Sequence, residues 1–261
     1  MNFITSTIKN YLFCDSFFFK KDKIKSIKII VLVFLFSVQP VHGYDFVPSE
    51  SEWLSWPDYC KARYVTLPIG ESSEWAREVS QERIALARKS IGDVFTHVHH
   101  YCAGAAWVNR ANISFDDAEK KEFYRKAIDE ISYVLERVDN SQPIVSSMMI
   151  RIAQAYEGSG DSLNAERFYW NSVKFFAEDG STYASLALFL RKNKRLLEAS
   201  QVLTEGDAIT EGNSVDINIM MAHVLLELGQ GRDAVAYAKK AYTMGYPLPN
   251  LKEKLIELSL W

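Results

Sequence analysis

The chain has 261 residues, of which 48% are hydrophobic and 24% are charged, and its formal net charge at pH 7 is −3. This composition is typical of a folded protein with a sizeable core. Without its first 43 residues the chain keeps 24 basic and 31 acidic residues and has no basic stripe, which argues against a nucleic-acid-binding protein.

Residues 1–43 have the pattern of a secretory signal. Five lysines between residues 20 and 28 precede the apolar run 29–36, and the small residue Gly43 follows. The uncharged stretch 29–38 is about half of the roughly 20 residues that a membrane-spanning helix needs. We therefore expect cleavage after Gly43 and a periplasmic or secreted protein that is not inserted in a membrane. Retention of the segment as an uncleaved anchor is the alternative.

Cysteine usage agrees with export. Cys14 lies in the signal segment, so the mature chain keeps only Cys60 and Cys102. In an oxidising compartment an isolated pair is most simply a disulfide, and two unrelated buried thiols are the alternative. We expect the bridge.

Proline and aromatic residues dominate 44–72 and predict an irregular lead-in. Its three prolines exclude a long helix, although 53–62 has room for a turn or two. The capping chemistry of Ser72, Ser73 and Glu74 then predicts the start of a helix, whose apolar stripe extends to Ala87.

Two longer helices are predicted over 93–111 and 115–138. The first contains Gly104 beside two alanines, small residues that let another helix approach closely, and the second has apolar residues at i, i+3/i+4 spacing. Residues 140–143 end this pattern. No stretch shows the two-residue alternation of strands, so we expect an all-α fold.

Three later stretches repeat one pattern, beginning at Ser146, Gly180 and Val215. Their starts are 34 and 35 residues apart, the period of a helix–turn–helix repeat. The eighth and twentieth positions of every unit are small: Ala153, Ala187 and Ala222, then Ala165, Ala199 and Ala234. The seventh and eleventh are large: Ile152, Leu186 and Met221, then Tyr156, Leu190 and Leu225.

At these positions the chain resembles the tetratricopeptide repeat family, in which small residues let the two helices of a unit pack closely. One departure is Lys194, which stands where Gly160 and Gly229 supply the turn glycine. An altered unit upstream has His100, Gly104 and Trp107 in its first helix and Ala127 at position 20. That alignment requires a connection about 11 residues longer than usual.

The resemblance implies an all-α, right-handed α-α superhelix of helical hairpins. The expected organisation is a signal at 1–43, an irregular aromatic lead-in at 44–72, N-terminal helices with an atypical hairpin at 73–145, three repeats at 146–246 and a capping helix at 247–261.

The family's register also implies a partner-binding concave face, formed by the first helix of each unit. The candidates are Ile150, Gln154, Glu157, Ala184, Leu188, Arg191, Ile219, His223 and Leu226. Such a mostly apolar surface suits an apolar or helical segment of another protein or peptide. Coverage by the lead-in or by the capping helix is an equally open interpretation.

His97, His99 and His100 are candidate metal ligands, since His97 and His100 share a helix face. Reduced Cys60 and Cys102 would add soft ligands. In the competing interpretation His100 is a packing residue and Cys102 belongs to the bridge, and we expect neither metal nor cofactor.

Catalytic motifs are missing from the sequence: it has no Gly-x-Ser-x-Gly elbow and no phosphate-binding loop. We expect a non-catalytic scaffold or assembly factor of the bacterial periplasm or cell envelope, and not an enzyme. A periplasmic metal- or cofactor-binding protein that uses the three histidines is the alternative.

Overall fold

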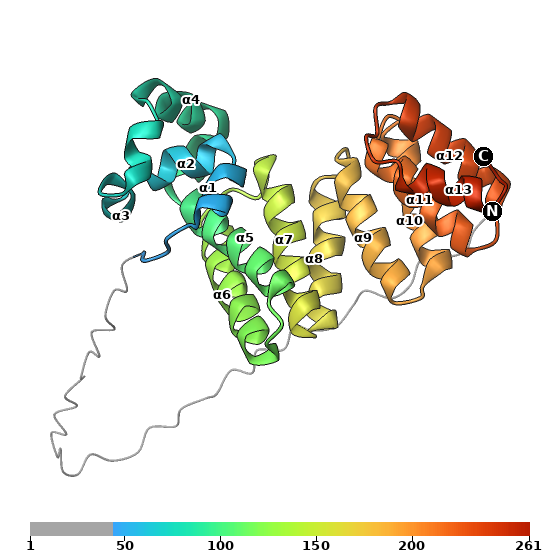
Figure 1. Ribbon diagram of the computed structural model, residues 1–261, viewed down its shortest axis with the longest axis horizontal. Coiled ribbons are helices and arrows are strands. Elements are labelled where there is room, and N and C mark those ends of the chain that lie inside the picture. The colour runs from blue at the N-terminus through green and yellow to red at the C-terminus, as the bar shows by residue number, and fades with distance from the viewer. Residues whose placement is uncertain (1–43) are drawn as a thin grey trace, which may run out of the picture. The chain divides into compact units, whose positions relative to one another are not determined.

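The computed structural model of the chain describes residues 44–261. The predicted signal and its cleavage site lie outside these residues. The described part forms one compact unit of thirteen α-helices and two short 3-10 helices, without a strand between residues 44 and 261 (Figure 1). The prediction of an all-α fold is confirmed for this part of the chain.

The lead-in is more regular than its prolines predict. It contains three short helices, α1 (Glu50–Ser55), α2 (Asp58–Tyr64) and α3 (Pro68–Glu71). Pro57 is the N-cap of α2, and Pro68 begins α3, where the N–H that proline lacks has no partner inside the helix anyway. The prolines therefore start helices, and the expectation of an irregular segment is wrong in this respect.

The helix predicted to begin at Ser72, Ser73 and Glu74 is divided in two. A 3-10 helix, η1 (Glu74–Glu78), ends at Val79, which is extended, and α4 (Gln81–Ile91) follows. Ser80 caps α4, since its hydroxyl accepts a hydrogen bond from the backbone N–H of Arg83. The prediction placed the helix start at the first of two serine caps, whereas the α-helix begins at the second.

The predicted helix at 93–111 begins as a 3-10 turn, η2 (Gly92–Thr96), and continues as α5 (Val98–Ile113). It pairs with α6 (Asp117–Leu135), and Gly104 lies at the close approach: a Cβ added there would be 3.2 Å from the carbonyl oxygen of Ala127. Only residues 114–116 connect the two helices. The predicted long connection is therefore wrong, because the additional residues extend the helices instead.

Three helical hairpins follow, and each pairs a first with a second helix: α7 (Ile144–Ser159) with α8 (Ser162–Phe175), α9 (Gly180–Lys192) with α10 (Leu196–Ile209), and α11 (Val215–Glu227) with α12 (Gly231–Thr243). Second helices also pack on the first helix of the next hairpin, so the hairpins are layered in chain order (Figure 1). The six alanines at positions 8 and 20 are all buried, as close packing of the helices requires.

The turn within each hairpin has one backbone geometry. Gly160, Lys194 and Gly229 have φ angles of 89°, 62° and 77°, the left-handed conformation that ends many helices. The residue after each donates its N–H to the carbonyl five residues earlier, in the pairs Asp161–Tyr156, Arg195–Leu190 and Gln230–Leu225. Lys194 thus occupies the position of the turn glycine and leaves the turn unchanged.

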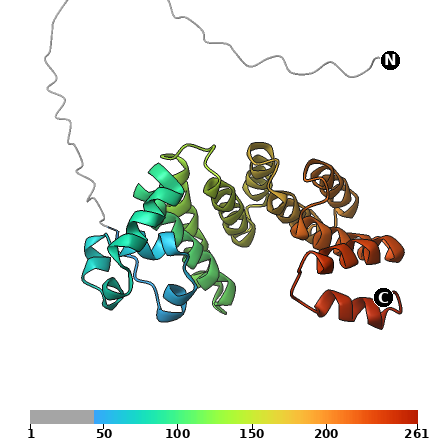
Figure 2. The ribbon, with the colours of Figure 1, turned by 90° about the horizontal axis from the view of Figure 1, so that it is seen from above.

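The C-terminal helix α13 (Asn250–Glu257) lies at the predicted capping position. Its Leu251 and Leu255 are buried in one cluster with Ile219 of α11 and Ala238 of α12, and Figure 2 shows α13 alongside the last hairpin. This contact covers an apolar side of the hairpin α11–α12, as a capping helix does in repeat proteins.

Candidate partner-binding surface

The nine predicted partner-binding residues lie on α7, α9 and α11, the first helices of the three hairpins. Ala184 and Ile219 are buried, and the remaining seven are half-buried. Ile219 belongs to the cluster that contains Leu251 and Leu255, and Leu226 packs against the same cluster. The chain itself therefore covers part of the third hairpin, and the more open candidates are those of α7 together with Leu188 and Arg191 of α9.

Two ion pairs join neighbouring hairpins at the same repeat positions. Glu157 at position 12 is 2.8 Å from the ammonium of Lys192, which is at position 13 of the next unit. Arg191 at position 12 is 2.6 Å from the carboxylate of Glu227, again at position 13 of the next unit. The phenol of Tyr169 also donates a hydrogen bond to Glu157. Glu157 and Arg191 therefore already have partners within the chain.

The surroundings of the histidine of this surface favour its neutral form. Burial lowers the pKa of His223, and the positive charges of Arg191 and Lys254 lower it further, against the opposing effect of Glu227. Ile150, Gln154 and Leu188 are neutral as well. The half-buried residues that do not form ion pairs thus offer apolar and neutral polar groups.

Lys192, Glu227 and Lys254 belong to this surface but were not predicted from the sequence. Lys192 and Glu227 could have been predicted, since a charged residue at position 12 of one unit is followed by an oppositely charged residue at position 13 of the next unit. Lys254 lies on α13, outside the repeats, and the repeat pattern carries no information about its distance from His223.

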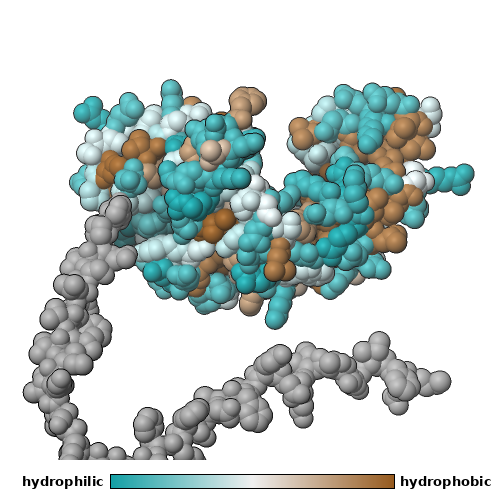
Figure 3. Space-filling view, turned by 90° about the horizontal axis from the view of Figure 1, so that it is seen from below, coloured by the Kyte–Doolittle hydropathy of each residue, from teal (hydrophilic) through white to brown (hydrophobic). Residues whose placement is uncertain are grey.

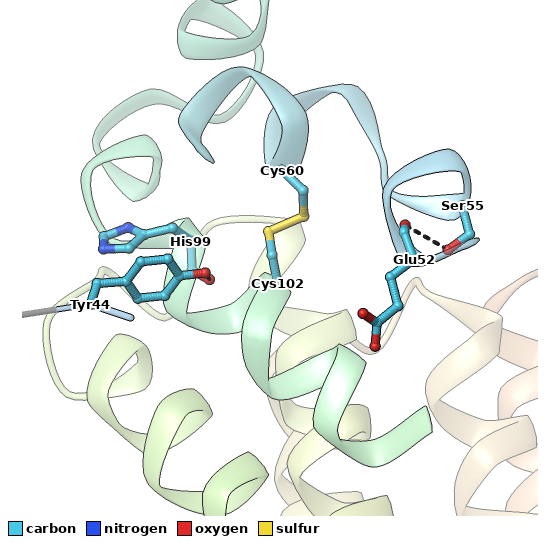
Figure 4. The surroundings of a disulfide bond; sticks show 6 residues. All are labelled: Tyr44, Glu52, Ser55, Cys60, His99 and Cys102. Carbon is cyan, nitrogen blue, oxygen red and sulfur yellow. Dashed lines mark hydrogen bonds between the residues drawn. A yellow bond between two sulfur atoms is a disulfide. The ribbon is translucent and has the colours of Figure 1, made fainter. Parts of the chain in front are cut away.

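The predicted disulfide is confirmed. Cys60 of α2 and Cys102 of α5 are bonded through their sulfur atoms, with their Cα atoms 5.8 Å apart, and both residues are buried (Figure 4). The bond attaches the lead-in to the first long hairpin. It also removes both thiols as metal ligands.

The three candidate metal-binding histidines make aromatic contacts. The imidazole of His99 contacts the ring of Tyr44 edge to face, with 4.7 Å between the ring centroids. Figure 4 shows these two side chains near the disulfide. His97 and His100 both contact the ring of Tyr133, at 5.7 and 4.1 Å. The rings of His99 and His100 also contact each other, at 4.2 Å between centroids, so the three imidazoles belong to one aromatic cluster with Tyr44 and Tyr133.

The polar surroundings of His99 and His100 differ. Nδ1 of His100 lies 2.5 Å from a carboxylate oxygen of Glu130, whereas Nδ1 of His99 is buried without a hydrogen-bond partner. Burial, with the nearby His100 and Arg63, lowers the pKa of His99 to about 3. Between residues 44 and 261, no three His, Cys, Asp or Glu side chains are grouped so that they could hold a metal ion.

Apolar side chains are also exposed, and Figure 3 shows them gathered over the part of the molecule that α10–α13 occupy. Exposed apolar residues near the C-terminal end of the chain are Met244, Leu248, Ile256 and Leu258. None of the helices in the described part combines the length and apolar character needed to cross a bilayer.

These features define the class: an all-α protein of consecutive helical hairpins, with a disulfide-linked N-terminal segment and a C-terminal closing helix. Comparison with models of known protein families finds no match, and comparison with curated protein sequences finds no significant relative.

Proposed function

We propose that this is an exported, non-catalytic adaptor or assembly factor of the bacterial periplasm or cell envelope, built as a right-handed superhelix of tetratricopeptide-like repeats. Its partner is another protein or peptide, bound along the concave face. The observation that carries the proposal is the common turn at Gly160, Lys194 and Gly229, because three hairpins with one turn and one spacing behave as repeats of one unit.

The chemistry of the first helices supports an apolar segment as the partner. Ile150, Gln154 and Leu188 are half-buried and uncharged, and Glu157 and Arg191 are neutralised by partners in the chain. A surface of this kind gains affinity from apolar burial, as in grooves that accept an amphipathic helix.

The Cys60–Cys102 bridge supports export, because disulfides persist in oxidising compartments and are rare in the cytosol. The signal-like pattern of residues 1–43 agrees with this location. Fractionation of cells and N-terminal sequencing of the mature protein test it: a mature chain that begins at Tyr44 is expected, and a cytosolic chain that retains residue 1 would refute export.

Site-specific photocrosslinking in cells tests the concave face. A photoreactive residue replaces Gln154 on the first helix of one unit, and its matched control replaces Gln201, an exposed glutamine on the second helix of the next. We expect Gln154 to give a discrete crosslinked partner and Gln201 to give little. Equal crosslinking from both positions would contradict binding through the first helices.

A charge substitution then measures the contribution of the surface to affinity. Leu188→Asp should weaken binding of the crosslinked partner by about tenfold or more, because burial of a leucine contributes roughly 1.5–3 kcal/mol. Leu163→Asp is the control, since Leu163 is 82% exposed on α8. If both variants remain folded and bind equally well, the concave face is not the binding surface.

A further inference from the structure

An open pocket of about 400 Å³ lies in the N-terminal part of the chain, where α2, α4 and η2 meet. None of the residues predicted to bind a partner lines it. Its lining residues are Arg63, Arg88, Gly92, Asp93, Phe95 and Thr96. Two guanidinium groups therefore border one pocket outside the repeats.

The Arg63 guanidinium is held in place by neutral groups. Its Nε donates to the backbone carbonyl of Thr96 at 3.2 Å, and one terminal nitrogen donates to the hydroxyl of Thr66 at 2.7 Å. The second terminal nitrogen is not used in these two bonds. Because guanidinium is planar, fixing two of its nitrogens also fixes the direction in which the third one donates.

Arg88, on α4, lines the same pocket as Arg63. The central carbon of its guanidinium lies 5.0 Å from the ring centre of Phe95, and that of Arg63 lies 6.0 Å from the same ring. Phe95 is buried, so its position is fixed by the core. One rigid aromatic ring thus locates both cations.

Neither guanidinium forms an ion pair with a carboxylate between residues 44 and 261. In this part of the chain, no carboxylate oxygen lies within 4.0 Å of Arg63 or Arg88, whereas Arg83 pairs with Asp58. Burial lowers the pKa of Arg63, and the positive charge of Arg88 lowers it further, against the opposing effect of the Tyr44 phenol. An anion in the pocket would relieve this repulsion.

We propose that the pocket binds a phosphate group. A carboxylate has two oxygens, and one bidentate arginine uses both of them. A terminal phosphate presents three oxygens and up to two negative charges, so it accepts hydrogen bonds from two guanidiniums at once. This site lies outside the proposed partner-binding face and does not depend on it.

Asp93 is the acidic residue in the lining of this pocket. Its carboxylate repels an incoming anion. Asp93→Asn removes that repulsion and keeps the shape of the side chain. It should therefore strengthen phosphate binding, a result that a nonspecific loss of structure would not produce.

Calorimetry on the mature, disulfide-bonded protein tests the proposal, with inorganic phosphate as the probe and acetate as the comparison anion. Arg88→Gln and Arg63→Gln should each raise the dissociation constant for phosphate by about tenfold, since each substitution removes charge-assisted hydrogen bonds to the anion. Asp93→Asn should lower it. Arg83→Gln is the matched control, because Arg83 already pairs with Asp58, and it should bind as the original chain does.

Arg88 is exposed and makes no bond to Thr66 or Thr96, so its variant keeps the test valid even if Arg63→Gln unfolds the protein. The proposal is overturned if phosphate does not bind at millimolar concentration, if both arginine variants bind as the original does, or if acetate binds as tightly. Vesicles that contain phosphatidic acid, whose headgroup is a terminal phosphate, compared with vesicles of phosphatidylcholine alone, identify the source of the group. Arginine-dependent binding to the former indicates a lipid headgroup, and arginine-dependent binding to free phosphate alone indicates a soluble ligand.

Discussion

The turn between α9 and α10 gives a prediction whose size follows from the backbone. Lys194 has a φ of 62°, and this left-handed conformation costs a residue with a Cβ about 1–2 kcal/mol. Glycine avoids that cost but adds roughly 0.4–1 kcal/mol of conformational entropy to the unfolded chain. The side chain of Lys194 is exposed, so Lys194→Gly should raise the free energy of unfolding by about 0.5–1 kcal/mol.

Urea unfolding of the disulfide-bonded protein, followed by far-ultraviolet circular dichroism, measures this change. Two further variants serve as comparisons for the effect of Lys194→Gly. Lys194→Ala keeps a Cβ and should stay within about 0.5 kcal/mol of the original. Gly160→Ala introduces a Cβ at the equivalent turn and should destabilise by about 1 kcal/mol.

The reasoning is refuted if Lys194→Gly lowers the urea midpoint, or if Gly160→Ala leaves it unchanged. Either result would mean that the two turns do not share the left-handed conformation. The structural equivalence of the hairpins would then be lost, and with it the main support for a repeat protein.

Three further predictions concern the disulfide, the packing at Gly206 and the pH dependence of stability. Replacing Cys60 and Cys102 by serine should lower the free energy of unfolding by about 4 kcal/mol in urea, because the bridge spans 42 residues, and a loss near zero would contradict it. Gly206→Ala should lower the melting temperature although alanine favours helices, because the new Cβ would lie 2.5 Å from Cγ of Tyr183; overpacking costs roughly 1–3 kcal/mol. Stability should fall as the pH drops from 6.5 towards 3, since unfolded His99 takes up a proton that the folded protein does not bind until about pH 3. His99→Phe should reduce this slope, and an unchanged slope would assign it to other groups.

The repeats could be predicted because they depend on local signals. Alanine at positions 8 and 20 marks the helix crossings in every unit, and these residues are buried. The register was also recognisable at Lys194, where the expected glycine is missing, because the residues on both sides keep the pattern.

The N-terminal part could not be predicted to the same extent, because its signals are ambiguous or nonlocal. Serines both before η1 and before α4 look like helix caps, and only tertiary packing selects the second for the α-helix. The phosphate-site candidates Arg63 and Arg88 are 25 residues apart on separate helices, and no periodic pattern relates them. The register of the candidate partner-binding residues followed from the repeat, but the ion pairs of Glu157 and Arg191 required the structure.

The ion pairs between hairpins have a consequence for the order of the units. Their polarity alternates: the acid is Glu157 at position 12 of the first junction, and it is Glu227 at position 13 of the second. Duplicating the middle hairpin would bring Arg191 against a copy of Lys192, and deleting it would bring Glu157 against Glu227. Like charges at these positions destabilise the junction. The alanines at positions 8 and 20 would accept the hairpins in any order and number, so it is the alternating charge that distinguishes this arrangement from a longer, shorter or shuffled array.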